Sequence, residues 1–261
     1  MTSDTTGRKR TLTTRCQFCG KELPRRNFAL VGHKPMMVTL PCDCPKAQEE
    51  AEREAQEIER RERAQAFATA WTAAGIPEAF AHVDADFRLA APLFAGRSLY
   101  IMGENGRGKT HAACRAAKAY MVRHTYRDGT TMRCWRRCMF VTAQGVLSQL
   151  RSSWDRWDQN EEDVFRRWAG VGLLVLDDLG KGVPSEWAAE SLFRLVDARW
   201  SNGRPMIVTS QYSADELADR YDKAGEETMR ALMSRLDGWS DGIRLDGPDR
   251  RLEKSEIPEQ S

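Results

Sequence analysis

A phosphate-binding loop is the feature that most narrows the folds open to this chain. Residues 103–110 read Gly-Glu-Asn-Gly-Arg-Gly-Lys-Thr, which is the G-x-x-x-x-G-K-T pattern. The apolar run 98–102 before the loop predicts a buried strand, and the run 111–120 after it predicts a helix. The alternative, a glycine-rich turn with an incidental Gly-Lys-Thr, does not account for both flanks. The segment therefore predicts a nucleoside triphosphate site in an α/β fold.

The loop also predicts what its residues do. Glycines let the backbone bend around phosphates and direct N–H groups at them, and the helix N-terminus adds a partial positive charge. We expect Lys109 to reach the β- and γ-phosphates and the Thr110 hydroxyl to bind Mg²⁺. The expected contacts with the nucleotide are Gly103, Glu104, Asn105, Gly106, Arg107, Gly108, Lys109 and Thr110.

A second apolar run, 172–176, ends in two carboxylates and a glycine turn. In an open α/β sheet, ligands bind beyond the carboxyl ends of the strands. We therefore expect Asp177 to join Thr110 in the Mg²⁺ shell and Asp178 to orient the attacking water. Alone, two aspartates after a strand would fit a simple turn equally well. The phosphate loop favours the catalytic interpretation.

A third apolar run, 204–211, predicts a strand beside the phosphate-loop strand and also ends in polar residues. Either Ser210 or Gln211 is a candidate for a hydrogen bond to the γ-phosphate or to the attacking water. The alternative is a strand end that is merely capped by polar side chains.

Apolar periodicity predicts a parallel sheet with helices on both faces, the arrangement of a P-loop NTPase. The expected strands are 98–102, 138–142, 172–177, 205–210 and 242–246, and the expected helices are 109–124, 143–152, 159–169, 185–200 and 213–220. Composition divides the 261 residues into a basic module (1–45), a charged linker helix (46–75) and an ATPase domain (76–261).

The N-terminal module contains a C-x-x-C pair, Cys16 and Cys19, and a C-x-C pair, Cys42 and Cys44. Four thiolates from two close pairs suit a tetrahedral structural zinc ion, which would supply much of the folding free energy of so small a segment. A redox C-x-x-C is the rival, but it has no use for the second pair. His33 is a weaker candidate ligand. Cys134 and Cys138 are expected to be ordinary strand and loop cysteines.

A basic stretch runs from residue 115 to 151, with eight Lys or Arg residues and a single acid, Asp128. Tyr120, Tyr126 and Trp135 are interleaved with these charges. Cations that follow a backbone and aromatic rings that stack on bases suit single-stranded DNA. A solvated basic face with aromatic residues in the core is the alternative.

The sequence contains neither an apolar stretch of about 18 residues nor a charged and then apolar leader. We therefore expect a cytoplasmic protein. The clustered, odd-numbered cysteines favour reduced thiols over a disulfide framework.

Residues 65–251 resemble the helicase-loader ATPases of bacteria and phages, the DnaC/DnaI group, of which the transposition helper IstB is a close relative. The run 186–200, followed by Arg204-Pro205 and Thr209-Ser210, carries this resemblance. The resemblance implies an AAA+ ATPase of the initiator clade that forms an ATP-dependent oligomer. Some members of the group also have an N-terminal zinc-binding region that contacts the helicase.

The resemblance assigns roles to three more arginines. The segment 233–236 matches the one that carries the arginine finger, which makes Arg235 the residue that reaches a neighbouring subunit's ATP. Segment 247–251 lies where the family has a nucleotide-contacting arginine, so Arg250 and Arg251 are candidates for that role. Two positions depart from the pattern, since Gln211 replaces the sensor asparagine and Asp178 stands where many AAA+ ATPases have glutamate.

The motifs predict an ATPase that uses ATP and Mg²⁺, and the resemblance implies that it loads or remodels a replicative, DnaB-like helicase on single-stranded DNA. Two alternatives remain. One is an IstB-like transposition helper that coats duplex DNA, and the other is an adaptor that binds a nucleotide without hydrolysing it.

Overall fold

The structure is a computed structural model, and it describes residues 15–28, 36–153, 160–221 and 225–249. The chain divides into two compact units, residues 1–62 and 63–261. The division falls inside the long helix α1 (Pro45–Thr72), and each unit is described by itself. The domain boundaries expected from composition stay a prediction.

The first unit is built around the two cysteine pairs. Strands β1 (Arg25–Phe28) and β2 (Met36–Thr39) form an antiparallel pair between them. The first part of α1 follows the second cysteine pair and has solvated ion pairs such as Arg61 to Glu57 at 2.9 Å. Among the described residues of this unit, only Cys16 is buried. The unit therefore has no apolar core in its described part.

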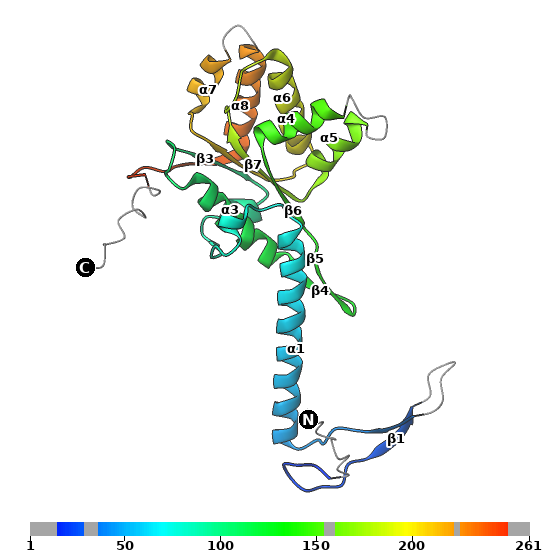
Figure 1. Cartoon of the computed structure of the whole chain (residues 1–261). Coiled ribbons are helices and arrows are strands. Elements are labelled where there is room, and N and C mark those ends of the chain that lie inside the picture. Colours follow the sequence, from blue (N-terminus) through cyan, green and yellow to red (C-terminus); the bar gives the residue numbers. More distant parts are fainter. Residues whose placement is uncertain (1–14, 29–35, 154–159, 222–224, 250–261) are drawn as a thin grey trace, which may run out of the picture. The chain divides into compact units, whose positions relative to one another are not determined.

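The second unit contains a five-stranded parallel sheet in the order β6-β7-β8-β3-β9 (Figure 1). The bounds are β3 (Ser98–Met102), β6 (Cys138–Thr142), β7 (Leu173–Leu179), β8 (Met206–Ser210) and β9 (Ser240–Arg244). The three central strands are buried along almost their whole length, as expected of a parallel sheet covered on both faces.

Helices cover both faces of this sheet (Figure 1). Strand residues such as Leu99, Val175 and Ile207 pack with helix α3 (Lys109–Arg123), and Trp71 at the end of α1 joins the same cluster. The alternate residues Leu174 and Val208 pack in the second cluster. The helices on that side are α4 (Ala143–Ser152), α5 (Glu161–Gly170), α6 (Glu186–Ser201), α7 (Ala214–Arg220) and α8 (Glu226–Trp239). The short η1 (Glu78–Phe80) and α2 (Ala91–Phe94) precede β3 and pack in the α3 cluster.

Side-chain caps place the starts of four helices just after the strands or loops that lead into them. The capping residues accept hydrogen bonds from backbone N–H groups of the first helical turn, and they are Thr142 for α4, Asn160 for α5, Ser185 for α6 and Ser213 for α7. These caps explain why the predicted helix starts agree closely with the observed ones.

The structure confirms the predicted parallel α/β sheet and corrects three details. Helix α8 was not expected, and it runs directly into β9, so this strand begins at Ser240 rather than at 242. The hairpin of β4 (Thr125–Asp128) and β5 (Thr131–Cys134) was not expected either. No helix among the described residues is long and apolar enough to cross a membrane, while the cytoplasmic location stays a prediction.

Candidate nucleotide-binding site

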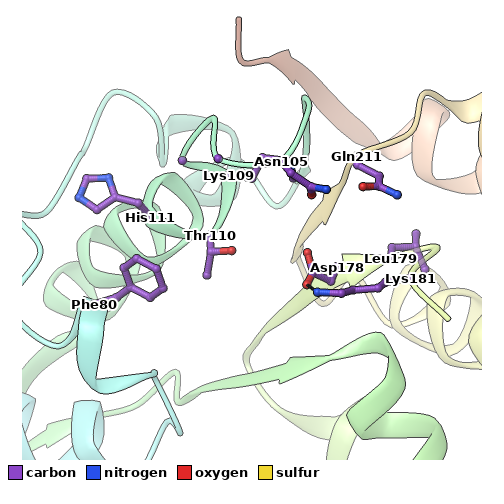
Figure 2. A pocket seen from close by; sticks show the side chains of 11 residues that line it. Phe80, Asn105, Lys109, Thr110, His111, Asp178, Leu179, Lys181 and Gln211 are labelled. Atoms are coloured by element: carbon purple, nitrogen blue, oxygen red, sulfur yellow. Dashed lines mark hydrogen bonds and ion pairs between the residues drawn. The ribbon is translucent and has the colours of Figure 1, made fainter. Parts of the chain in front are cut away.

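A cavity of about 700 Å³ lies at the carboxyl edge of the sheet, next to the phosphate loop. Its size is within the range of ordinary ligand pockets. Figure 2 shows Phe80 and His111 on one side of the cavity and Asp178, Lys181 and Gln211 on the other. Thr110 lies between the two sides, so the predicted phosphate and catalytic residues meet around one space.

The phosphate loop connects β3 to α3 as predicted. Gly103, Gly106 and Gly108 all have positive φ angles, of 152°, 80° and 85°. At Gly106, a Cβ atom would lie 1.9 Å from the Oδ1 atom of Asp249, so no other residue fits without displacing that side chain. Lys109 is the first residue of α3, and its Nζ atom donates a hydrogen bond to the Glu104 carbonyl at 2.9 Å. The loop therefore curls around its own lysine.

Thr110, which lines the cavity, contacts Asp177 although the two lie 67 positions apart in the sequence. The Thr110 hydroxyl donates to the Asp177 carboxylate, with oxygen–oxygen distances of 3.0 and 3.1 Å. Burial raises the pKa of the Asp177 carboxyl above its ordinary value, and the hydrogen bond from Thr209 opposes that rise. A hydroxyl beside a buried carboxylate is the donor set that fits Mg²⁺, which would also offset the cost of burying the charge.

Thr209 is a residue of this site that sequence reasoning missed. Its hydroxyl, fully buried in β8, donates to the Asp177 Oδ1 atom at 2.6 Å and accepts from the backbone N–H of Asp178 at 3.0 Å. Asp178 is the only described non-glycine residue with a positive φ angle, 57°. Such backbone is uncommon outside glycine and calls for local support. Thr209 therefore holds both acidic residues at once.

The two candidates for the phosphate-sensing residue have different surroundings. Gln211 lines the cavity. The Ser210 hydroxyl is buried instead, where it donates to the Leu179 carbonyl at 2.7 Å and accepts from the Tyr212 N–H at 3.1 Å. The structure does not place Ser210 at the cavity and leaves Gln211 as the candidate.

Three polar or aromatic residues that line the cavity lie outside the predicted set: Phe80, His111 and Lys181. The Nζ atom of Lys181 donates to the Asp178 carboxylate at 2.9 Å. Phe80 and His111 have ring centroids 6.3 Å apart in an edge-on arrangement. Their sequence contexts offered little signal, because Phe80 precedes the first strand of the sheet and Lys181 follows an ordinary glycine turn.

Arg235 does not line its own chain's cavity. It lies on α8, where it makes an ion pair with Asp197 of α6, and its guanidinium is stacked over the rings of Phe193 at 4.6 Å and Trp200 at 5.6 Å. A residue that acts on a neighbouring subunit's ATP need not be near its own, so the arginine-finger assignment stays a prediction. Arg250 and Arg251 lie outside the described residues.

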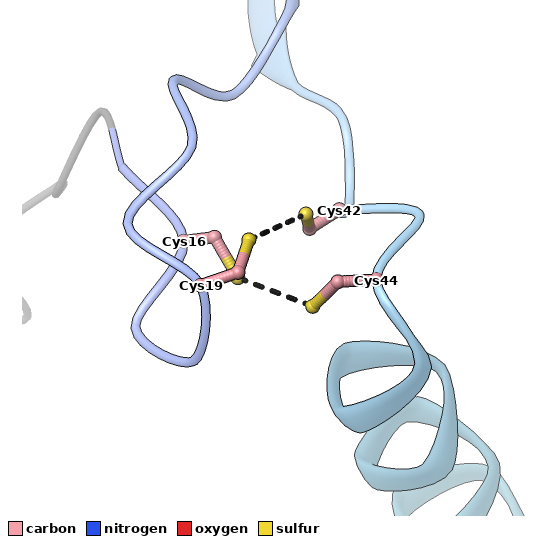
Figure 3. Close-up of side chains that lie close together, drawn as sticks. All are labelled: Cys16, Cys19, Cys42 and Cys44. Atoms are coloured by element: carbon pink, nitrogen blue, oxygen red, sulfur yellow. Dashed lines mark hydrogen bonds between the residues drawn. The ribbon is translucent and has the colours of Figure 1, made fainter.

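The four cysteines of the first unit form a cluster (Figure 3). Their sulfur atoms all lie within 4.8 Å of one another, with Cys16 to Cys44 at 3.8 Å and Cys19 to Cys42 at 3.5 Å. Four sulfurs each ~2.3 Å from a tetrahedral Zn²⁺ would be roughly 3.8 Å apart, so the spacing fits zinc. Hydrogen bonds from the backbone of Cys19 and Phe18 lower the pKa of Cys16 to about 7, which favours the thiolate.

The other candidate ligands are placed differently. His33 lies outside the described residues. Cys138 is buried in β6, and the Cys134 thiol is 3.7 Å from the Met121 carbonyl. Neither belongs to the cysteine cluster, which is the only group of three or more potential metal ligands found in the described part of the chain.

The aromatic residues of the basic stretch separate into two kinds. Tyr120 is buried in the core and stacks on Phe94, so its suggested role as a base-stacking residue is wrong. Its position on the inner face of α3 explains the burial. Tyr126 and Trp135 are about half exposed.

Comparisons with known proteins agree with this geometry. The model of a family described as IstB-like ATP binding protein matches residues 45–257. An insertion-sequence protein of Mycobacterium tuberculosis that is named for ATP binding is 27% identical over 162 residues, which are 62% of this chain and 59% of that protein. The replicative helicase loader DnaC of Escherichia coli is 22% identical over 133 residues, 51% of this chain and 50% of the loader.

This chain thus spans between half and three-fifths of the length of these curated relatives. Among solved structures, the crystal structure of DnaI is 19% identical and has a TM-score of 0.52, with 68% of this chain and 95% of that chain covered. At this identity the likeness concerns the fold alone, a parallel sheet covered by helices.

Proposed function

This chain belongs to the family of IstB-like ATP-binding proteins, and on that premise we propose that it is a Mg²⁺-dependent ATPase. The observation that carries the proposal is that Lys109, Thr110 and Asp178 line one cavity, where the Thr110 hydroxyl is hydrogen-bonded to the Asp177 carboxylate. These residues come from two segments of the chain, the phosphate loop with the start of α3 and strand β7, and each has the chemical group that its predicted role requires.

In the proposed reaction, backbone N–H groups of the phosphate loop and the Lys109 ammonium hold the β- and γ-phosphates. Thr110 and Asp177 would hold Mg²⁺, which neutralises charge on the phosphate oxygens. Asp178 accepts a hydrogen bond from the attacking water and orients it in line with the bond to be broken. Gln211, opposite the phosphate loop, contacts the γ-phosphate.

We further propose that ATP hydrolysis serves to load or remodel a replicative helicase on single-stranded DNA in the cytoplasm. The similarity to DnaC and the fold shared with DnaI support this assignment. Arg235 would act in a neighbouring subunit, so that hydrolysis depends on an oligomer. The cysteine cluster would bind Zn²⁺ and present the first unit to the helicase.

A transposition helper that acts on duplex DNA is the second candidate. The family match and the relative from an insertion sequence support it. A nucleotide-binding adaptor without hydrolysis is the third, and the two departures from the family pattern, Asp178 and Gln211, are its only support.

ATP turnover measured alone, with a single-stranded oligonucleotide and with a duplex of the same length separates the three candidates. The loader assignment predicts stimulation by the single strand, and the transposition assignment predicts stimulation by the duplex. Asp178→Asn should bind ATP normally and lose turnover, whereas Asp246→Asn, a carboxylate paired with Arg244, should keep it. Wild-type protein that binds ATP without any turnover would leave only the adaptor.

A further inference from the structure

The β4–β5 hairpin has two different faces. Strands β4 and β5 pair Tyr126 with Arg133 and Thr125 with Cys134, joined by a two-residue turn with Gly129 at a φ of 57°. Thr125 is buried and Cys134 is half-buried, so their face lies against the domain. The face of Tyr126 and Arg133 is exposed. Figure 1 shows the hairpin extending away from the five-stranded sheet.

Two aromatic rings lie together on the exposed face. Tyr126 and Trp135 are stacked with centroids 5.9 Å apart and an interplanar angle of 14°, and they are 49% and 48% exposed. A folded protein normally buries such rings, because their apolar area stabilises a core. A rigid, nearly parallel pair that stays open to solvent is instead suited to stack on another flat ring.

The charge around this pair is strongly positive. The hairpin and the two residues after Trp135 contain four exposed arginines and one exposed acid, Asp128. Arg133 shares the face of the rings, Arg136 and Arg137 follow Trp135, and Arg127 is on the other face, opposite Met132. Cations interleaved with open aromatic rings match a single-stranded polyanion, whose bases are free to stack. A duplex offers its phosphates but keeps its bases stacked on one another, so it would not use the rings.

The base of the hairpin is held firmly by α3. The Thr125 hydroxyl donates to the Met121 carbonyl at 2.8 Å, and the backbone N–H of Trp135 donates to the carbonyl of His124, the residue after α3, at 3.0 Å. Helix α3 begins at Lys109 in the nucleotide site. One helix of 15 residues, about 22 Å long, thus connects the phosphate loop to the hairpin.

We propose that the exposed face of the β4–β5 hairpin binds single-stranded DNA, with Trp135 and Tyr126 stacking on bases and Arg136 and Arg137 contacting phosphates. This inference rests on the single-strand part of the proposed function and gives it a surface. It also explains the two kinds of aromatic residue in the basic stretch, since only those on the hairpin are available to a ligand.

The first test uses the full chain and a fluorescent 20-nucleotide dT strand, with the dissociation constant measured over a series of salt concentrations. Trp135→Ala should weaken binding roughly 5- to 150-fold, the equivalent of one lost base stack, with little change in the salt slope. Trp135→Phe should retain most of the affinity. Trp200→Ala, a tryptophan of α6 that is also 48% exposed, is the matched control and should bind like the wild type.

The second test separates charge from stacking. Arg136→Ala with Arg137→Ala should weaken binding and reduce the salt slope by about 1.4, because each phosphate contact on a single strand contributes about 0.7. Arg60→Ala with Arg61→Ala removes an equally adjacent and exposed pair from α1 and should change neither quantity. ATP binding by every variant verifies that the ATPase domain is folded.

Each remaining outcome decides against the inference in a different way. If the wild type binds dT and Trp135→Ala binds equally well, the hairpin is not the stacking surface, while the proposed function stands. If only the arginine changes matter, and they matter equally for a duplex, the face is a general polyanion site. If the wild type does not bind dT at all, both the hairpin inference and the single-strand part of the proposed function are wrong.

Discussion

The two units of this chain position the side chains of their candidate binding sites in opposite ways. In the second unit, Asp177 and Thr209 are anchored in buried strands, so the sheet positions them before any ligand arrives. In the first unit, the four cysteines form a similarly close cluster, yet β1 is exposed along its whole length and Cys16 is the only buried residue described. The fold therefore orders the nucleotide site, whereas we propose that a bound metal ion orders the cysteine cluster.

The largest expected effect is on ATP binding at the nucleotide site, which the fold orders before any ligand arrives. Lys109→Ala should abolish measurable ATP binding, because it removes the side-chain cation directed at the β- and γ-phosphates, while circular dichroism stays like that of the wild type. Binding of a fluorescent ATP analogue is the measurement. Lys118→Ala is the matched control, because Lys118 lies on the same helix and donates to the Val83 carbonyl at 2.7 Å. Unchanged affinity in Lys109→Ala would refute the phosphate-loop assignment.

Arg235 sharpens the comparison, because an ordered cavity need not be a complete active site. Arg235→Ala should leave ATP binding intact and lower the turnover that depends on assembly by about 10³-fold or more, because an arginine finger contributes roughly 10³- to 10⁵-fold. Turnover per chain as a function of protein concentration measures this. Arg230→Ala, on the same helix and paired with Glu226 and Asp219, should behave like the wild type. Equal turnover of Arg235→Ala and wild type at high concentration would remove Arg235 from the site.

Thr209 tests how the fold orders the acidic pair. Thr209→Val removes the hydroxyl that holds Asp177 and Asp178, and a lost buried hydrogen bond costs about 1–3 kcal/mol. We expect turnover to fall about tenfold and the Mg²⁺ concentration for half-maximal activity to rise, with Thr209→Ser restoring both. A general loss of stability would change the melting temperature without this dependence on Mg²⁺. Normal Mg²⁺ dependence in Thr209→Val would show that the two bonds are dispensable.

The sequence predicted the parts of this site that depend on local pattern. A strand, a glycine loop and a helix identify Lys109 and Thr110, and the rule that parallel strands end at one edge brings Asp177 to them. Thr209 was missed because all five residues of β8 are buried. The strand therefore lacks an alternation of apolar and polar residues that would single out the side chain in contact with Asp177. Contacts between strands are set by register, which a single sequence does not contain.

The hairpin and α8 were missed for a different reason. Residues 125–134 are mostly polar, so they lack the apolar run that marks a strand, and only the pairing of Tyr126 with Arg133 reveals the hairpin. Tyr120 is buried because its face of α3 packs in the core, whereas Tyr126 lies on the exposed face of the hairpin. Helix α8 begins after Gly225, without a side-chain cap to mark its start.

Removal of the proposed zinc ion should have the smallest effect on ATP turnover and should act mainly on the structure of the first unit. A zinc-selective chelator, used with Mg²⁺ present, should release about one zinc ion per chain and expose Cys16, Cys19, Cys42 and Cys44 to alkylation, because little else in that unit is buried. ATP turnover without a partner should stay unchanged, since the sheet holds the nucleotide site by itself. Cys44→Ser should lose zinc, whereas Cys134→Ser, outside the cluster, should keep it. A freshly purified, untagged chain with far less than one zinc ion, and with all four thiols already reactive, would contradict the zinc site. A loss of ATP turnover that parallels the loss of zinc would instead show that the two units depend on one another.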